Sequence, residues 1–201
     1  MKTLRWILCV ALIGFSVPAS AGERTNARRI ARAEQKIQQA PVPSDAVGAA
    51  YTRDIRFSWI PFYPPFGAFG SAGYGVAFDR DSDGYLSNPR IVRRAGVGVT
   101  ATIGIGVPWS ISQSERVLAF QSSPELDDFA SKKHVTATVK AFAAVGVPGK
   151  LFVADVGHTF GHQPGGTVVW KRDIFVGLFA SAGGSAEVNA QWPKRTSRRG
   201  K

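Results

Sequence analysis

Apolar and polar residues alternate along much of the chain after residue 47, which is the pattern of β-strands. The clearest run covers residues 97–107, where apolar side chains alternate with glycine and threonine over eleven residues. A face built only from small residues suits tight curvature or the close approach of another element, as in a small barrel. Similar runs occur at residues 74–78, 116–121, 135–147, 167–170 and 175–180. We therefore expect a mainly β protein with one compact, β-barrel-like domain.

Two helices are expected outside this pattern. Residues 24–40 are mostly Ala, Arg and Gln and are followed by Pro41 and Pro43, and their few apolar side chains predict a loosely attached N-terminal helical arm. The second is a short internal helix that begins at Ser123, an N-cap residue, with Pro124 at its first position and acidic residues in its first turn.

The first residues have the features of a signal peptide. Lys2 and Arg5 precede an apolar run at residues 6–17, which is too short to span a bilayer, and Ala19-Ser20-Ala21 supplies the small residues of a cleavage site. We expect residues 1–21 to be removed and the protein to be exported to the periplasm. The alternative is an uncleaved signal anchor. The single cysteine, Cys9, lies in this segment, which excludes a disulfide framework in the mature chain.

Positive charge is concentrated at both ends of the expected mature chain. The formal net charge of the whole chain is +11. We divide the mature chain into a basic helical arm and linker (22–46), a nearly neutral β domain (47–193) and a basic tail (194–201). Charge at the ends of an exported protein argues against nucleic acid and favours an anionic membrane surface, unless the ends only confer solubility. The candidate basic contacts are Arg28, Arg29, Arg195, Arg198 and Arg199.

An aromatic segment at residues 57–69 is the second candidate for lipid contact. It contains three prolines, which prevent a regular helix or a central strand. Aromatic rings favour the membrane interface, where one edge can stay hydrated. The alternative is that the rings close the open end of the barrel. The candidate side chains are Trp59, Phe62, Tyr63, Phe66 and Phe69.

The order of several short motifs resembles the SYLF lipid-binding domain over about residues 47–190. These motifs are residues 73–79, Asp83-Gly84-Tyr85, Asn88-Pro89, residues 116–120, 138–144, 146–149 and 177–185, and Asn189. The resemblance implies a compact β-rich domain that binds anionic lipids or phosphoinositides and has no catalytic activity.

Several motifs of enzymes and metal sites are incomplete. Residues 96–101 mimic a dinucleotide fingerprint but lie within a strand pattern, and Leu151 stands where a phosphate loop needs Ser or Thr. Asp79, Asp81 and Asp83 match the first half of an EF-hand loop, but the twelfth position is Arg90, so we favour a hairpin turn over a weak calcium site. His158 and His162 lie in a segment that we expect to be a polar loop rather than a metal site. We expect no enzyme and no cofactor.

These observations favour a monomeric, non-enzymatic, exported lipid-binding or envelope-associated protein that contacts an anionic membrane surface. The alternative is a structural or partner-binding envelope-integrity protein without a lipid ligand. An integral outer-membrane barrel is disfavoured, because the chain ends in basic residues and not in an aromatic-tipped strand.

Overall fold

The fold is a single curled sheet with two helices. The structure is a computed structural model that describes residues 23–60, 66–162 and 164–194. The mainly β class, the N-terminal helix and the short internal helix are confirmed. In chain order the elements are α2 (Glu23–Gln39), β1 (Gly48–Trp59), β2 (Phe66–Arg80), β3 (Leu86–Gly106), β4 (Trp109–Phe120), α3 (Ser123–Ser131), β5 (His134–Val147), β6 (Lys150–Phe160), β7 (Thr167–Val176) and β8 (Phe179–Pro193).

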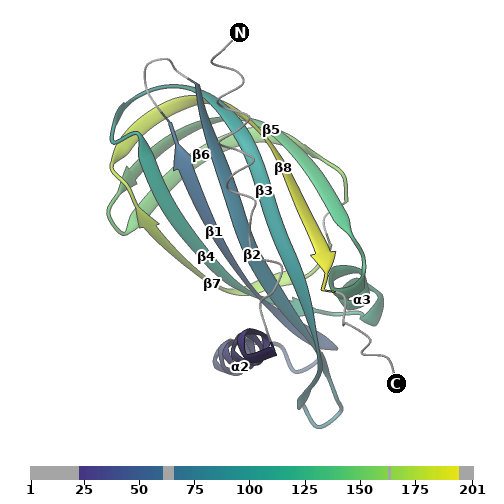
Figure 1. Cartoon of the computed structure of the whole chain (residues 1–201). Coiled ribbons are helices and arrows are strands. Elements are labelled where there is room, and N and C mark those ends of the chain that lie inside the picture. Colours follow the sequence, from purple (N-terminus) through teal and green to yellow (C-terminus); the bar gives the residue numbers. More distant parts are fainter. Residues whose placement is uncertain (1–22, 61–65, 163, 195–201) are drawn as a thin grey trace.

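All eight strands pair antiparallel in the order β6-β5-β8-β3-β2-β1-β4-β7, so β6 and β7 form the two edges. The sheet curls into a half-barrel (Figure 1). Its edges approach each other at one end, where the main-chain N–H of Gly149 donates to the carbonyl of Phe175 over 2.9 Å. No ladder joins β6 to β7 in the described part of the chain, so the barrel is open along this line.

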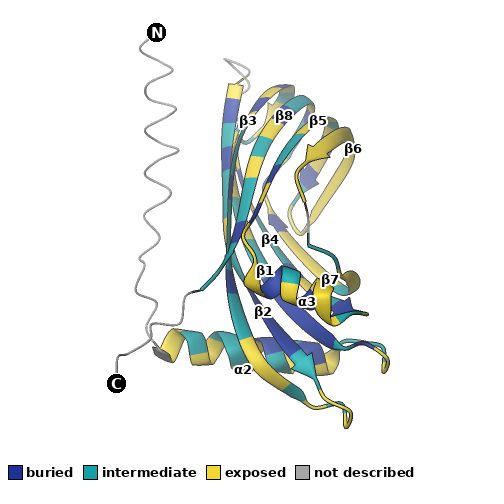
Figure 2. Ribbon diagram, turned by 90° about the vertical axis from the view of Figure 1, so that its right-hand side faces the viewer, coloured by how far each residue is buried: buried dark blue, intermediate teal, exposed yellow. Residues whose placement is uncertain are grey.

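The two helices cover opposite faces of the same end of the sheet (Figure 2). Helix α2 packs Ala33 and Ile37 on the outer, convex face, and α3 packs Leu126, Phe129 and Ala130 on the inner, concave face. The outer cluster is completed by Ala49, Tyr51, Val76, Phe78 and Val117, and the inner cluster by Ala50, Ala77, Val92 and Phe120. Both faces are therefore buried at this end, which we call the covered end.

Helix α2 is more firmly packed than the sequence suggested. The expectation of a loosely attached arm is wrong, because Ala33 and Ile37 are almost fully buried against the sheet. Basic side chains also stack on sheet aromatics, with Arg29 at 4.8 Å from the ring centre of Tyr74 and Lys36 at 5.3 Å from that of Trp170. In α3 the N-cap is Ser122, one residue before the expected Ser123.

Most of the expected strands are present but the structure extends them. The run at 97–107 is the second half of β3, and the run at 135–147 coincides with β5 within one residue. The expected polar loop around His158 is wrong, because β6 continues to Phe160 and pairs with β5 through Val139 and His158. Glycine and histidine in that stretch gave a loop-like pattern, but pairing with β5 fixes the backbone as a strand.

Glycines on the inner face leave room for side chains from neighbouring strands. A Cβ atom on Gly98 would lie 2.1 Å from the ring of Phe69, and one on Gly73 would lie 2.1 Å from Oδ1 of Asp54. The space above Gly73 on β2 lets Asp54 of β1 reach its ion-pair partner, Arg94 of β3. The glycine face of the alternating run thus permits close approach, as its pattern predicted.

Candidate functional site

The outer face changes character at one row of laterally paired residues. This border row consists of Arg172, Glu115, Arg53, Tyr74, Arg93 and Trp192, one each from β7, β4, β1, β2, β3 and β8. On one side of it the outer face is covered by α2. On the other side no helix of the described chain covers the sheet, and most of the outward side chains are apolar.

We call this second region the bare apolar face. Its most exposed members are Ile103 (82%), Val156 (76%) and Ile105 (75%). Within the described strands, polar side chains occupy its outward positions at Gln113, at His158 and at Lys150, the first residue of β6. Gln113 accepts a 2.7 Å hydrogen bond from Arg53 of the border row. Its large exposed residues are Ile55, Phe57, Trp59, Phe66, Val99, Ile103, Ile105, Trp109, Ile111, Val135, Val139, Val145, Phe152, Val156, Phe160, Ile174, Val176 and Val188.

The inner face carries the charged side chains together with apolar ones such as Leu118 and Phe175, and it lines a cavity of about 910 Å³. Two of its ion pairs join different strands, Arg94 with Asp54 and Arg56 with Glu187 at 3.3 Å, whereas Lys171 pairs with Asp173 of the same strand at 2.7 Å. Arg116 also faces the cavity, and its Nε donates to the hydroxyl of Ser114 at 3.3 Å. A half-buried antiparallel sheet in water normally turns its apolar side inward, whereas a membrane barrel turns it outward.

Burial affects the charged groups on the inner face. It raises the pKa of the Asp54 carboxyl, although Arg94 and Arg116 act in the opposite direction. It also lowers the pKa of the Arg56 guanidinium, against the opposing effect of Glu187. These charges are thus partly desolvated and depend on their partners, so they fasten strands to one another across the inside of the half-barrel.

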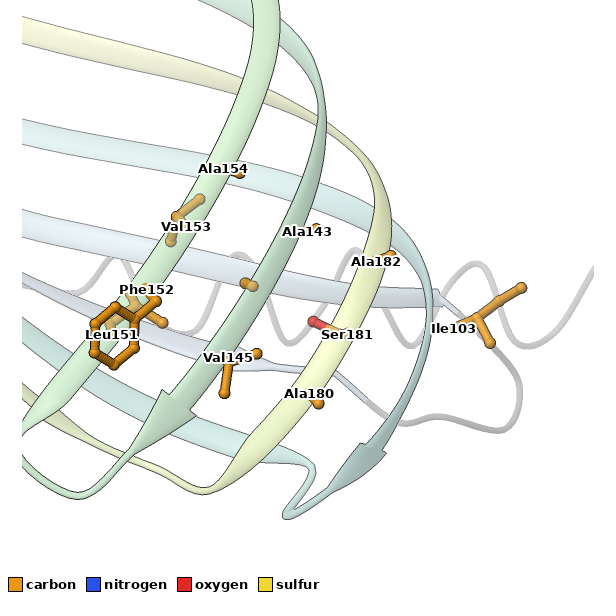
Figure 3. A pocket seen from close by; sticks show the side chains of 11 residues that line it. Ile103, Ala143, Val145, Leu151, Phe152, Val153, Ala154, Ala180, Ser181 and Ala182 are labelled. Carbon is orange, nitrogen blue, oxygen red and sulfur yellow. The ribbon is translucent and has the colours of Figure 1, made fainter.

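A shallow groove of about 760 Å³ crosses the bare apolar face over β3, β8, β5 and β6 (Figure 3). Small side chains on β5 and β8 form its middle, including Ala143, Ala180 and Ala182. The larger Ile103 and Phe152 stand at its two sides. The groove is therefore an extended apolar strip with no charged lining residue.

Helix α2 lies next to the border row and presents cations. Arg24, Arg28 and Arg32 are exposed on the helix, and the half-buried Arg29 stacks on Tyr74 of the border row. A basic helix therefore runs along the line where the apolar surface ends.

The expected lipid-contact residues are only partly brought together. Trp59 and Phe66 lie on the bare apolar face, 46% and 59% exposed, so they do not close the end of the barrel. Phe69 differs, because it points inward, is 8% exposed and lies 3.7 Å beneath the guanidinium of Arg56, so it is not part of the outer surface. Arg28 and Arg29 are on α2, far from these aromatics in sequence. Phe62, Tyr63, Arg195, Arg198 and Arg199 lie outside the described residues.

The aspartate motif forms a hairpin turn between β2 and β3, as its strand-like flanks predicted. Asp79 pairs with Arg90 and accepts a 2.7 Å hydrogen bond from the amide of Asn88. Oδ1 of Asp81 accepts the main-chain N–H groups of Asp83 and Tyr85 at 3.1 and 2.8 Å. The carboxylates of Asp79 and Asp81 thus stabilise the turn through these contacts.

Most of the bare apolar face was not identified from sequence. The run at 97–107 was recognised as a strand, but alternation alone does not show which face of a strand points outward. Phe152 and Val156 were missed because β6 was not recognised. One signal was available in the sequence. The residues that alternate with the apolar ones are Gly and Thr, whereas a face exposed to solvent would carry Lys and Glu, so the apolar face need not be the inner one.

No family model, curated protein or solved structure matches this chain. Neither α2 nor α3, the helices of the described residues, is long and apolar enough to cross a membrane.

Proposed function

We propose that the protein is a non-enzymatic, exported, lipid-binding protein of the cell envelope that seats its bare apolar face in the hydrocarbon of a membrane. The observation that carries this proposal is the reversed polarity of the sheet beyond the border row, with apolar side chains outside and paired charges inside. Exposed apolar patches of this extent mark interaction or membrane surfaces. Lipid binding is also what the resemblance to the SYLF domain implies.

The dimensions of the bare apolar face fit a bilayer. Along β3 the outward side chains from Val97 to Ile105 are all apolar, and along β5 the same holds from Val135 to Val147. A tilted strand needs about 9–11 residues to cross the hydrocarbon core. Both stretches reach that length, so the outer surface matches a full apolar layer rather than a small contact patch.

Helix α2 would then lie at the level of the headgroups. Its apolar side is occupied by the sheet, and Arg24, Arg28 and Arg32 project from it beside the border row. Each Lys or Arg close to an anionic surface contributes roughly 1 kcal/mol. The helix therefore supports the choice of anionic lipid over neutral lipid.

The described edge strands β6 and β7 are not paired with each other along their length. In a membrane their free backbone groups would need partners, because unpaired strand edges are not stable in hydrocarbon. We propose that the two edges pair in the membrane by extending the contact between Gly149 and Phe175. This register places Leu151 opposite Asp173, and both side chains face inward in the present sheet.

A disulfide tests this closure. The pair Leu151→Cys with Asp173→Cys is expected to cross-link within one chain after incorporation into vesicles. The control pair, Phe152→Cys with Asp173→Cys, combines an outward with an inward position and is expected to stay reduced. Cross-links between chains in place of links within one chain would show that the edges pair with a second copy.

The proposal itself is tested by one charge placed on the bare apolar face. Ile103→Arg puts a cation at an outward position of β3, where burial in hydrocarbon costs about 2–4 kcal/mol, so vesicle binding should fall roughly 30- to 1,000-fold. The matched control is Tyr85→Arg, at an exposed apolar residue in the β2–β3 turn at the covered end. Flotation with anionic vesicles measures both, and equal binding by the two variants would contradict the proposal.

A further inference from the structure

Three potential metal ligands meet beside α3, outside the bare apolar face. Asp128 comes from α3, His134 begins β5, and His162 lies between β6 and β7. Nε2 of His162 is 2.8 Å from Oδ2 of Asp128, and Nε2 of His134 is 3.6 Å from the same oxygen. Ligand atoms of all three residues lie within 4.8 Å of one another.

These separations suit a tetrahedral ion. Zinc binds imidazole nitrogen and carboxylate oxygen at about 2.0–2.2 Å, which places neighbouring ligand atoms roughly 3.3 Å apart. The distances from the two imidazole nitrogens to Oδ2 of Asp128, 2.8 and 3.6 Å, lie on either side of that value. Only small side-chain movements are therefore needed to bring the three atoms around one ion.

The surroundings hold the ligands as a metal site requires. The side chain of His134 is only 7% exposed, and its Nε2 donates a 2.8 Å hydrogen bond to the main-chain oxygen of Asp128, which fixes the ring beside the carboxylate. Lys132 holds Oδ1 of Asp128 at 2.9 Å, which leaves Oδ2 directed at the two imidazoles. Groups that orient a ligand in this way are typical of metal centres. A zinc ion would take the place of the proton that Nε2 of His134 directs at the main-chain oxygen of Asp128.

We propose that Asp128, His134 and His162 form a zinc site with a fourth position open to water. Two imidazoles and one carboxylate favour zinc over magnesium and calcium, which prefer oxygen ligands. The 71% exposed side chain of His162 gives an ion access from solvent. Bound zinc would tie the segment after β6 to α3 and to the start of β5, beside the inner cavity that His134 lines. This inference does not depend on membrane binding.

The chain contains a matched control for this site. Its third histidine, His158, lies on the outer face of β6, where its ring packs edge-on against Phe160 with centroids 4.5 Å apart. His158→Ala and His162→Ala therefore remove the same chemical group four residues apart. His162 is exposed, so its removal leaves the packed core intact.

Tag-free protein is titrated with zinc chloride by calorimetry and melted with and without the ion. We expect binding of one zinc per chain and, near 100 times the dissociation constant, a rise in Tm on the order of 5 °C. Magnesium and calcium chlorides should leave the Tm unchanged. His162→Ala and Asp128→Asn should each weaken zinc binding at least about 10-fold, whereas His158→Ala should bind as the wild type does.

The proposal is overturned if zinc does not bind, or if His162→Ala binds it as tightly as the wild type. It is also overturned if His158→Ala is the variant that loses zinc. Circular dichroism of each variant confirms that the comparison is made between folded proteins.

Discussion

The two ends of the same sheet differ in whether a helix covers the outer face. At the covered end, α2 and α3 bury both faces, and residues such as Tyr51 and Phe120 have no solvent exposure. At the other end the outer face has exposed apolar side chains, including Ile103 and Val156, and neither helix of the described residues lies over them. The strands are continuous from one end to the other, so the difference arises from side-chain pattern and helix placement and not from a separate domain. Under the proposed function, the covered end supplies folding stability in water and the bare apolar face would supply a surface for lipid.

The largest expected effect is on the free energy of unfolding, and it distinguishes the covered end from the bare apolar face. Phe129→Ala removes a ring that is 2% exposed and packs on Phe120 with centroids 5.4 Å apart, so the free energy of unfolding should fall by about 3–5 kcal/mol. Ile103→Ala removes an 82% exposed side chain and should leave the free energy of unfolding in detergent nearly unchanged. Denaturant unfolding of both variants checks this contrast. A large loss for Ile103→Ala would show that this residue belongs to a core.

A smaller effect is expected where the two ends meet. Gly73→Ala places a methyl group 2.1 Å from Oδ1 of Asp54 and 2.4 Å from the main-chain oxygen of Arg53, and this crowding should cost about 1–3 kcal/mol. Gly70, on the same strand, has its nearest obstacle at 3.9 Å, so Gly70→Ala should cost nothing. Thermal melting of the pair tests the claim that the inner face is closely packed at Gly73. Equal Tm values for the two variants would contradict it.

The smallest effect concerns the charge beside the border row. Arg28→Gln removes one exposed cation from α2 and should weaken binding to anionic vesicles about 5-fold, equivalent to roughly 1 kcal/mol. Binding to neutral vesicles should not change, and high salt should reduce the difference. Lys133→Gln, an exposed cation beside α3, is the control. A similar loss for both variants would indicate dependence on net charge rather than on the position of α2.

The sequence contained enough to predict the class of fold but not its polarity. The alternation at 97–107 and the helix signals at Pro124 and Pro41 are local patterns, and the structure has a strand and helices at these places. The direction of a strand face depends on sheet curvature and on which side each helix packs, so Ile103 could not be assigned to the outside from its neighbours alone. The meeting of His134 and His162 depends on the path of β5 and β6, which links residues distant in sequence.

The central claim, that the bare apolar face lies in lipid, is tested most directly by spin labels on adjacent residues of β5. Val139 points outward and Thr138 inward, and the only cysteine of the chain, Cys9, lies in the expected signal peptide. In anionic vesicles, a label at Val139→Cys should be accessible to oxygen and protected from a water-soluble nickel reagent. A label at Thr138→Cys should show the opposite accessibility. Equal exposure of both labels to the nickel reagent in vesicles would contradict the account and favour a protein partner or solvent as the environment of this face.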